Sequence, residues 1–112
     1  MKRYGLMGRL RPDSVGKYVE LHAETWPAVL QRNTDCNIQN YSIFLRALPG
    51  GEQWVFAYFE YVGDDFESDM KRMAGDPEIQ RWWDECKPCF EQVAALPAGE
   101  VWAPMESVFH QD

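Results

Sequence analysis

Residues 41–60 read YSIFLRALPGGEQWVFAYFE and are the stretch that most strongly determines the fold. Apolar residues alternate over 41–45, a proline and two glycines at 49–51 predict a turn, and the aromatic-rich run 54–60 is typical of a strand. Two strands joined so closely pair as an antiparallel hairpin. Both faces of the second strand are apolar, so we expect each face of the sheet to be covered. The residues of one face are Trp54, Phe56 and Tyr58, and those of the other are Val55, Ala57 and Phe59.

The segment before the hairpin predicts a strand followed by a helix. Residues 2–10 are apolar at alternating positions, which favours a strand. Asp13 or Ser14 is expected to cap a helix that starts at Val15, where apolar residues recur at three- and four-residue steps. Because Pro27 lies inside this pattern, the helix is either kinked there or followed by a second short helix.

The segment after the hairpin predicts two more helices and a last strand. Apolar residues over 66–73 share one helical face, and Gly75 ends that helix. Asp76 is expected to cap the next helix, which carries a proline at its first position and ends at Pro88. The last strand is expected over Met105–His110.

This order of elements predicts an α+β fold of the ferredoxin-like, split βαβ type. Such a domain has a four-stranded antiparallel sheet with helices on one face. We expect one domain over residues 1–112, since a chain of 13.1 kDa has no room for two independent cores. A second subunit that packs sheet to sheet would cover the open apolar face, and we therefore expect a homodimer.

Composition excludes several kinds of partner. The net charge of −7 and pI near 4.7 argue against binding to nucleic acid or to an anionic membrane surface. No apolar run reaches the roughly 18 residues of a membrane-spanning helix. The short N-terminal apolar stretch, interrupted by Gly8 and Arg9, does not fit a signal peptide. Three cysteines, an odd number, predict free thiols and a cytoplasmic location.

His22 is the first candidate for chemistry. It lies on the apolar face of the first predicted helix, with Tyr18 one turn before it and Trp26 one turn after it. Histidine exchanges protons near neutral pH, so it could act as a general acid/base at the floor of an aromatic pocket. Alternatively it is a core histidine hydrogen-bonded to a backbone carbonyl. Spacing alone leaves both interpretations open.

Three further aromatic residues could line a binding site. Adjacent helical residues point about 100° apart, so Trp82 and Trp83 cannot both occupy one core position. One of them could offer a flat face to a sugar ring or a planar cofactor, or both could serve in the core and at an interface. Tyr41 offers a hydroxyl on an apolar body, or extends from a strand edge to water.

Other motifs do not support a site. Cys86 and Cys89 have the spacing of a redox pair, but they come at the C-terminal end of a helix, where the dipole disfavours a thiolate. The cysteines and histidines lack the paired spacing of a zinc site, and the acidic run 63–69 lacks the ligand pattern of an EF-hand. We expect no metal and no cofactor.

Four short motifs together resemble the L-rhamnose mutarotase family. They are Tyr18-Val19-Glu20-Leu21-His22, Trp26-Pro27, Asn40-Tyr41-Ser42-Ile43 and Gln80-Arg81-Trp82-Trp83. The resemblance covers nearly the whole chain, including the first strand and the closing Val108-Phe109. The resemblance implies a dimeric α/β barrel that interconverts the α and β anomers of a 6-deoxy sugar. It also implies that His22 acts as proton donor, and that Tyr18, Tyr41, Trp82 and Trp83 line the sugar site.

Mutarotation suits these residues. The reaction removes the proton of the anomeric hydroxyl, protonates the ring oxygen and recloses the ring on the other face. One acid/base group, a second polar group or water, and aromatic walls suffice for it. The turn at 47–53 and the stretch 64–75 depart from the family pattern, so the sugar could be L-fucose instead of L-rhamnose. Alternatives on the same fold are a cofactorless monooxygenase or haem-degrading enzyme, and a non-catalytic dimeric ligand-binding module.

Overall fold

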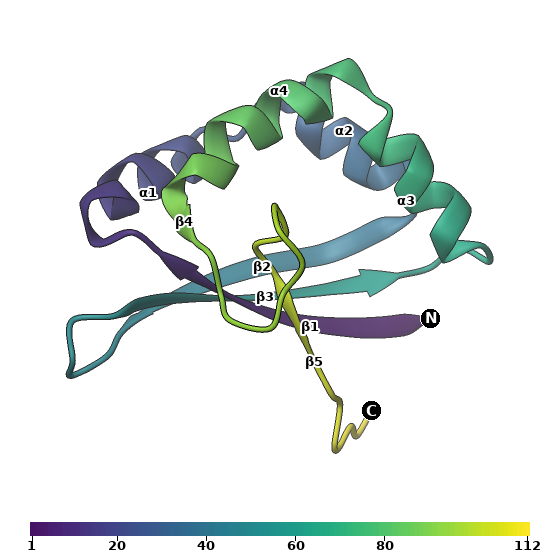
Figure 1. Cartoon of the computed structure of the whole chain (residues 1–112). Coiled ribbons are helices and arrows are strands. Elements are labelled where there is room, and N and C mark those ends of the chain that lie inside the picture. The colour runs from purple at the N-terminus through teal and green to yellow at the C-terminus, as the bar shows by residue number, and fades with distance from the viewer.

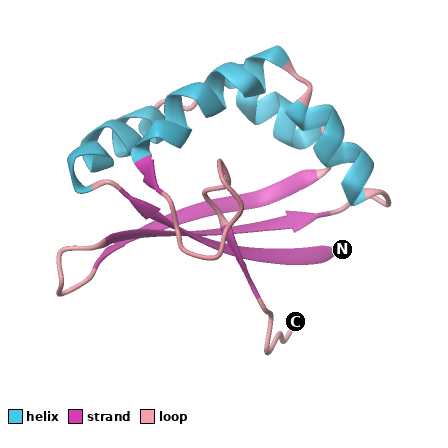
Figure 2. Cartoon of the chain, viewed as in Figure 1, coloured by secondary structure: helices cyan, strands magenta, loops and turns pink.

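The computed structural model describes residues 1–112 as an antiparallel sheet covered on one face by four α-helices (Figures 1 and 2). This arrangement confirms the predicted α+β, ferredoxin-like fold. The strands and helices are β1 (Lys2–Leu10), α1 (Val15–Ala23), α2 (Pro27–Asp35), β2 (Ile38–Ala47), β3 (Gln53–Tyr61), α3 (Phe66–Ala74), α4 (Pro77–Cys86), β4 (Phe90–Glu91) and β5 (Ala103–Met105).

The predicted hairpin is formed by β2 and β3, with β2 at the edge of the sheet and β3 between β2 and β1. The strand order is β2-β3-β1-β4, all antiparallel, and a short β5 pairs with the same β1 strand as β4. Strand β2 begins at Ile38, earlier than the alternation that starts at Tyr41, because the register shifts between Gln39 and Ser42. A register shift of this kind interrupts the alternation of side chains, so a period-two pattern does not detect the first residues of the strand.

Two predictions about helix ends have different outcomes. Asp76 caps α4 as expected, because its carboxylate accepts hydrogen bonds from the backbone amides of Glu78 and Ile79 at 2.9 and 3.2 Å. Ser14, one of the two predicted candidates, is the N-cap residue of α1, but its side chain makes no capping hydrogen bond: Asp13 and Ser14 lie in a 3₁₀ turn, and the Ser14 hydroxyl donates to Asp13 instead.

Pro27 divides the first helical segment into two helices. Helix α1 ends at Ala23, and Pro27 is the first residue of α2. At that position a proline leaves no helical hydrogen bond unmade, because the first amides of a helix have no partner within it. The second of the two predicted alternatives is therefore the observed one.

The predicted last strand over Met105–His110 is wrong in its extent. Strand β5 covers Ala103–Met105 and pairs with Gly5, Leu6 and Met7 of β1. The residues beyond it have no neighbouring strand, so their apolar side chains face solvent. Val108 and Phe109 are the clearest cases, being 89% and 78% exposed.

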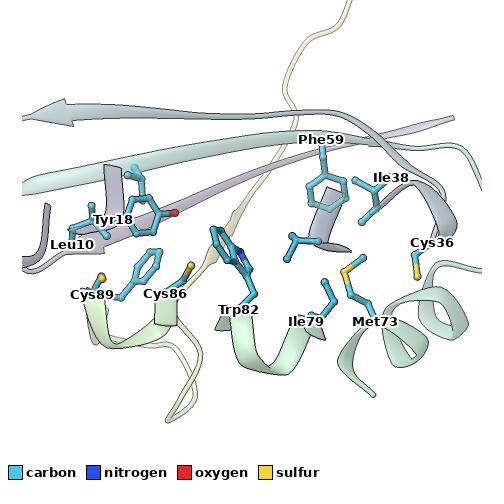
Figure 3. Close-up of a cluster of buried hydrophobic side chains, with 13 residues drawn as sticks. Leu10, Tyr18, Cys36, Ile38, Phe59, Met73, Ile79, Trp82, Cys86 and Cys89 are labelled. Carbon is cyan, nitrogen blue, oxygen red and sulfur yellow. The ribbon is translucent and has the colours of Figure 1, made fainter. Parts of the chain in front are cut away.

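The core lies between the helices and one face of the sheet (Figure 3). On β3, Val55, Ala57 and Phe59 are buried toward the helices, as the alternation predicts. The other face of the same strand is only half-buried, and Phe44 beside it on β2 is 65% exposed. None of the four helices is long and apolar enough to cross a membrane.

Candidate active site

A cavity of about 640 Å³ opens between the helices and the sheet. This volume lies in the range of small-molecule sites, which are mostly apolar with a few polar groups. The lining has 22 residues, of which 16 are hydrophobic. All the candidate residues of the sequence interpretation are among them, namely Tyr18, His22, Tyr41, Trp82 and Trp83. The fold therefore brings residues from α1, β2 and α4 around one space.

The hydrogen bond of His22 determines which ring nitrogen carries the proton. Its Nδ1 lies 2.8 Å from the backbone carbonyl oxygen of Tyr18, one helical turn earlier. A carbonyl can only accept, so Nδ1 of the neutral ring donates and Nε2 keeps a free lone pair. Burial lowers the pKa of His22 and outweighs the opposing effect of this hydrogen bond. At neutral pH the imidazole is therefore an uncharged base.

Both sequence interpretations of His22 thus describe part of what is observed. The side chain is hydrogen-bonded to a backbone carbonyl, as a core histidine would be. The same side chain lines the cavity, as an acid/base group would have to. The two features are compatible because they use different nitrogens of the ring.

Aromatic rings surround His22. The Tyr18 ring lies 4.2 Å from the imidazole, centroid to centroid, and the Trp82 ring lies 5.2 Å away in an edge-on arrangement. Trp26 packs in turn on Trp82 at 5.2 Å. Figure 3 shows the Tyr18 ring in the layer between sheet and helix α4, with its hydroxyl turned away from Leu10. These contacts hold the imidazole in one orientation.

The two phenols of the cavity stay protonated at neutral pH. Burial raises the pKa of Tyr18 well above its ordinary value, and the neighbouring Tyr41 adds to this effect. Burial also raises the pKa of Tyr41, to about 12. Tyr41 is 40% exposed as a whole residue, and its ring stacks on buried Phe59 with the centroids 5.4 Å apart. Each phenol can donate a hydrogen bond to a sugar oxygen.

Trp82 and Trp83 point in different directions, because they are neighbouring residues of one helix. Trp82 is 7% exposed and belongs to the core cluster. Trp83 is only partly buried, and the ammonium group of Lys87 lies 5.0 Å above its ring. Both line the cavity, so it has one indole wall within the core and another near solvent.

The sequence interpretation missed the contribution of residues 99–102. Figure 1 shows the loop before β5 entering the space between the sheet and the helices. Trp102 packs edge-on against Phe90 at 5.2 Å, and Glu100 provides the only carboxylate of the lining. A tryptophan within a proline- and glycine-rich loop was the available signal, because such a large side chain normally finds a packing partner.

The cavity has few groups suited to a metal or to redox chemistry. No three His, Cys, Asp or Glu side chains lie close enough together to hold a metal ion. Cys86 lines the cavity, but burial raises its pKa to about 12, so it is a thiol and not a thiolate at neutral pH. Cys86 and Cys89 are both free and buried.

Comparison with known proteins decides the family. The family model described as L-rhamnose mutarotase matches residues 3–111. The chain belongs to the L-rhamnose mutarotase family. This confirms the resemblance seen in the four sequence motifs, and it makes the chain an aldose mutarotase, which is an isomerase.

Individual mutarotases match over the full chain. L-rhamnose mutarotases from Oceanobacillus iheyensis and Lactiplantibacillus plantarum are 29% and 31% identical to it, and each alignment covers 100% of both sequences. The crystal structure of an L-rhamnose mutarotase from Formosa agariphila superimposes with a TM-score of 0.74 at 24% identity, over 100% of both chains. That structural similarity supports the fold.

Proposed function

We propose that this mutarotase interconverts the α and β anomers of L-rhamnose, with His22 as the acid/base residue. The observation that carries the proposal is the state of His22: a neutral imidazole with Nδ1 bonded to a carbonyl and Nε2 available, in a cavity with phenols and indoles. A general base works best when its pKa is near the operating pH and its ring is held in place.

The proposed reaction moves one proton. Nε2 of His22 accepts the proton of the anomeric hydroxyl, and the resulting imidazolium gives it to the ring oxygen as the bond between that oxygen and C1 breaks. The open-chain aldehyde then rotates about its C1–C2 bond. The same steps in reverse close the ring on the other face of C1. Acid/base assistance of this kind typically contributes roughly 10²–10⁴-fold, which is adequate for a reaction that proceeds slowly unaided.

The remaining lining residues suit a deoxy sugar. Tyr18 and Tyr41 supply hydroxyl groups that donate to sugar oxygens, while Trp82 and Trp83 supply flat apolar faces for the C–H-rich face of the ring. A lining of 16 hydrophobic residues among 22 also accommodates a methyl group. We infer that the substrate is L-rhamnose, in agreement with the family and the relatives described above. The test also includes L-fucose, the alternative sugar.

The proposal is tested by NMR saturation transfer between the anomeric protons of L-rhamnose. Adding the protein should accelerate the exchange in proportion to its concentration, and heat-denatured protein should not. L-fucose, D-ribose and D-galactose form the comparison panel, in which L-rhamnose should exchange fastest. No acceleration with any sugar would contradict the proposal, and a stoichiometric Soret band on titration with haemin would favour the haem-enzyme alternative.

We also propose that the working unit is a homodimer formed by the open faces of two sheets. That face carries half-buried Trp54, Phe56 and Tyr58 on β3, with Phe44 65% exposed beside them. Aromatic residues gathered on one exposed face are typical of subunit interfaces. Sedimentation equilibrium should give twice the mass of the 13.1 kDa chain.

The free, buried cysteines also fit the predicted cytoplasmic location, since thiols persist in reducing compartments.

A further inference from the structure

Strand β2 contains a β-bulge that includes one of the predicted site residues. Two residues, Asn40 and Tyr41, lie between the paired positions Gln39 and Ser42, where the facing strand β3 has only Phe59. Asn40 has a φ of 50°, in the left-handed region. An extra residue in that conformation bends a strand and redirects its side chains.

The bulge decides which side of the sheet Tyr41 occupies. Ile38 is buried on the helix side, so an uninterrupted strand would place Tyr41 on the opposite side, because side chains alternate. The extra residue reverses this alternation. Tyr41 and Ile43 consequently line the cavity, and Phe44 faces outward with 65% of its surface exposed.

A carboxylate on the outer face of the sheet holds the bulge. The side-chain amide of Asn40 donates to Glu60 Oε1 at 2.7 Å, and that of Gln39 donates to the same oxygen at 3.2 Å. The hydroxyl of Tyr58 donates to the other oxygen, Oε2, at 2.7 Å. These hydrogen bonds, with that from Asn40 contributing most, lower the pKa of Glu60, which therefore stays ionised at neutral pH.

Asparagine suits this position for two reasons. It tolerates a positive φ better than other residues with a side chain, and its amide reaches a neighbouring acceptor. We propose that Asn40, anchored to Glu60, is a positioning residue that sets Tyr41 toward the substrate from the opposite face of the sheet. This inference rests on the proposed function for its effect on catalysis, but its structural content can be tested separately.

The chain offers a matched control for Asn40. Asn37 also has a positive φ, of 65°, and its amide donates to a carboxylate, Asp69 Oδ2, at 2.9 Å. Asn37→Ala therefore loses the same kind of hydrogen bond and strains the same kind of backbone, but outside the bulge. A small displacement of a binding group can cost up to about 10²-fold in rate, so we expect kcat/KM for L-rhamnose to fall about tenfold in Asn40→Ala. In Asn37→Ala, kcat/KM should stay within about twofold of the wild-type value. Both variants should have a lower melting temperature than the wild type.

A double-mutant cycle separates positioning from general destabilisation. If Asn40 acts through Tyr41, adding Asn40→Ala to a Tyr41→Ala protein should not lower kcat/KM for L-rhamnose any further. The effects of two residues that act as a unit do not add. Additive losses would overturn the proposal. If Asn40→Ala does not fold, Asn40→Gly replaces it in the cycle, since glycine adopts the positive φ freely but lacks the amide.

A measurement without activity keeps the two proposals distinguishable. The rings of Tyr41 and Phe59 lie 5.4 Å apart, close enough for NOE contacts between their protons. These contacts should be present in the wild type and in Asn37→Ala, and lost or strongly weakened in Asn40→Ala. Their persistence in Asn40→Ala would overturn the positioning role. A wild type that shows the contacts but does not accelerate anomer exchange would instead contradict the proposed function.

Discussion

Replacing His22 by alanine should lower both the rate of anomer exchange and the stability of the fold, and the two effects can be measured separately. If Nε2 provides general acid/base assistance of roughly 10²–10⁴-fold, its loss raises the activation barrier by about 2.7–5.4 kcal/mol, at about 1.36 kcal/mol for each factor of ten. The folded state also loses stability, by about 2–4 kcal/mol in all, so the two losses are similar in size and have to be measured separately. It loses one hydrogen bond, worth about 1 kcal/mol, and ring contacts with Tyr18 and Trp82, worth about 0.5–1.5 kcal/mol each.

The assay measures both quantities on the same samples. Saturation transfer with L-rhamnose gives the exchange rate per mole of folded protein, and thermal unfolding followed by circular dichroism gives the stability. His110→Ala is the matched control, because this second histidine is at the exposed C-terminal end and does not line the cavity. If His22→Ala remains folded and exchanges the anomers within about threefold of the wild-type rate, the general acid/base assistance assigned to Nε2 is refuted.

Three other substitutions have distinct expected outcomes. Leu10→Ala removes a fully buried side chain that does not line the cavity, and should lower the free energy of unfolding by about 2–5 kcal/mol while leaving kcat/KM of the folded protein unchanged. Asp69 has a pKa lowered by hydrogen bonds from Tyr61 and Asn37, so its stabilising effect is present above the unfolded-state pKa and is lost as the pH falls through the folded-state pKa. The melting temperature of Asp69→Asn should therefore lie below that of the wild type at pH 7, with the gap narrowing below about pH 4; a constant gap would contradict this. Phe44→Asp should shift the sedimentation mass from dimer to monomer if the open sheet faces associate, and an unchanged mass would argue against that interface.

Much of the fold could be predicted because local patterns and burial agree in it. Asp76 and the proline after it give α4 an unambiguous start, and the alternation in β3 matches its burial residue by residue. The prediction failed at the C-terminal end, where the apolar residues are not buried. The apolar pattern over 105–110 has no partner strand, and a period-two pattern cannot show whether a neighbour exists.

The candidate site was predictable only in part. The spacing of Tyr18 and His22 on one helical turn follows from the sequence, but the lone pair left on Nε2 depends on a hydrogen bond to a carbonyl, which no pattern encodes. The orientation of Tyr41 depends on a bulge in which Asn40 is bonded to Glu60, a residue 20 positions after Asn40. The insertion of Trp102 into the cavity depends on where a long loop returns to the sheet.

If neutral His22 transfers the proton, the rate of anomer exchange must follow the protonation state of its imidazole. The pKa of His22, measured from its imidazole NMR shifts, should lie below the ordinary value of about 6.5, because burial disfavours the charged ring. The rate of L-rhamnose anomer exchange should be constant above that pKa and fall below it, with a midpoint at the same pH. A midpoint that differs clearly from the measured pKa of His22, or a rate that does not fall as His22 becomes protonated, would show that His22 is not the proton-transfer group.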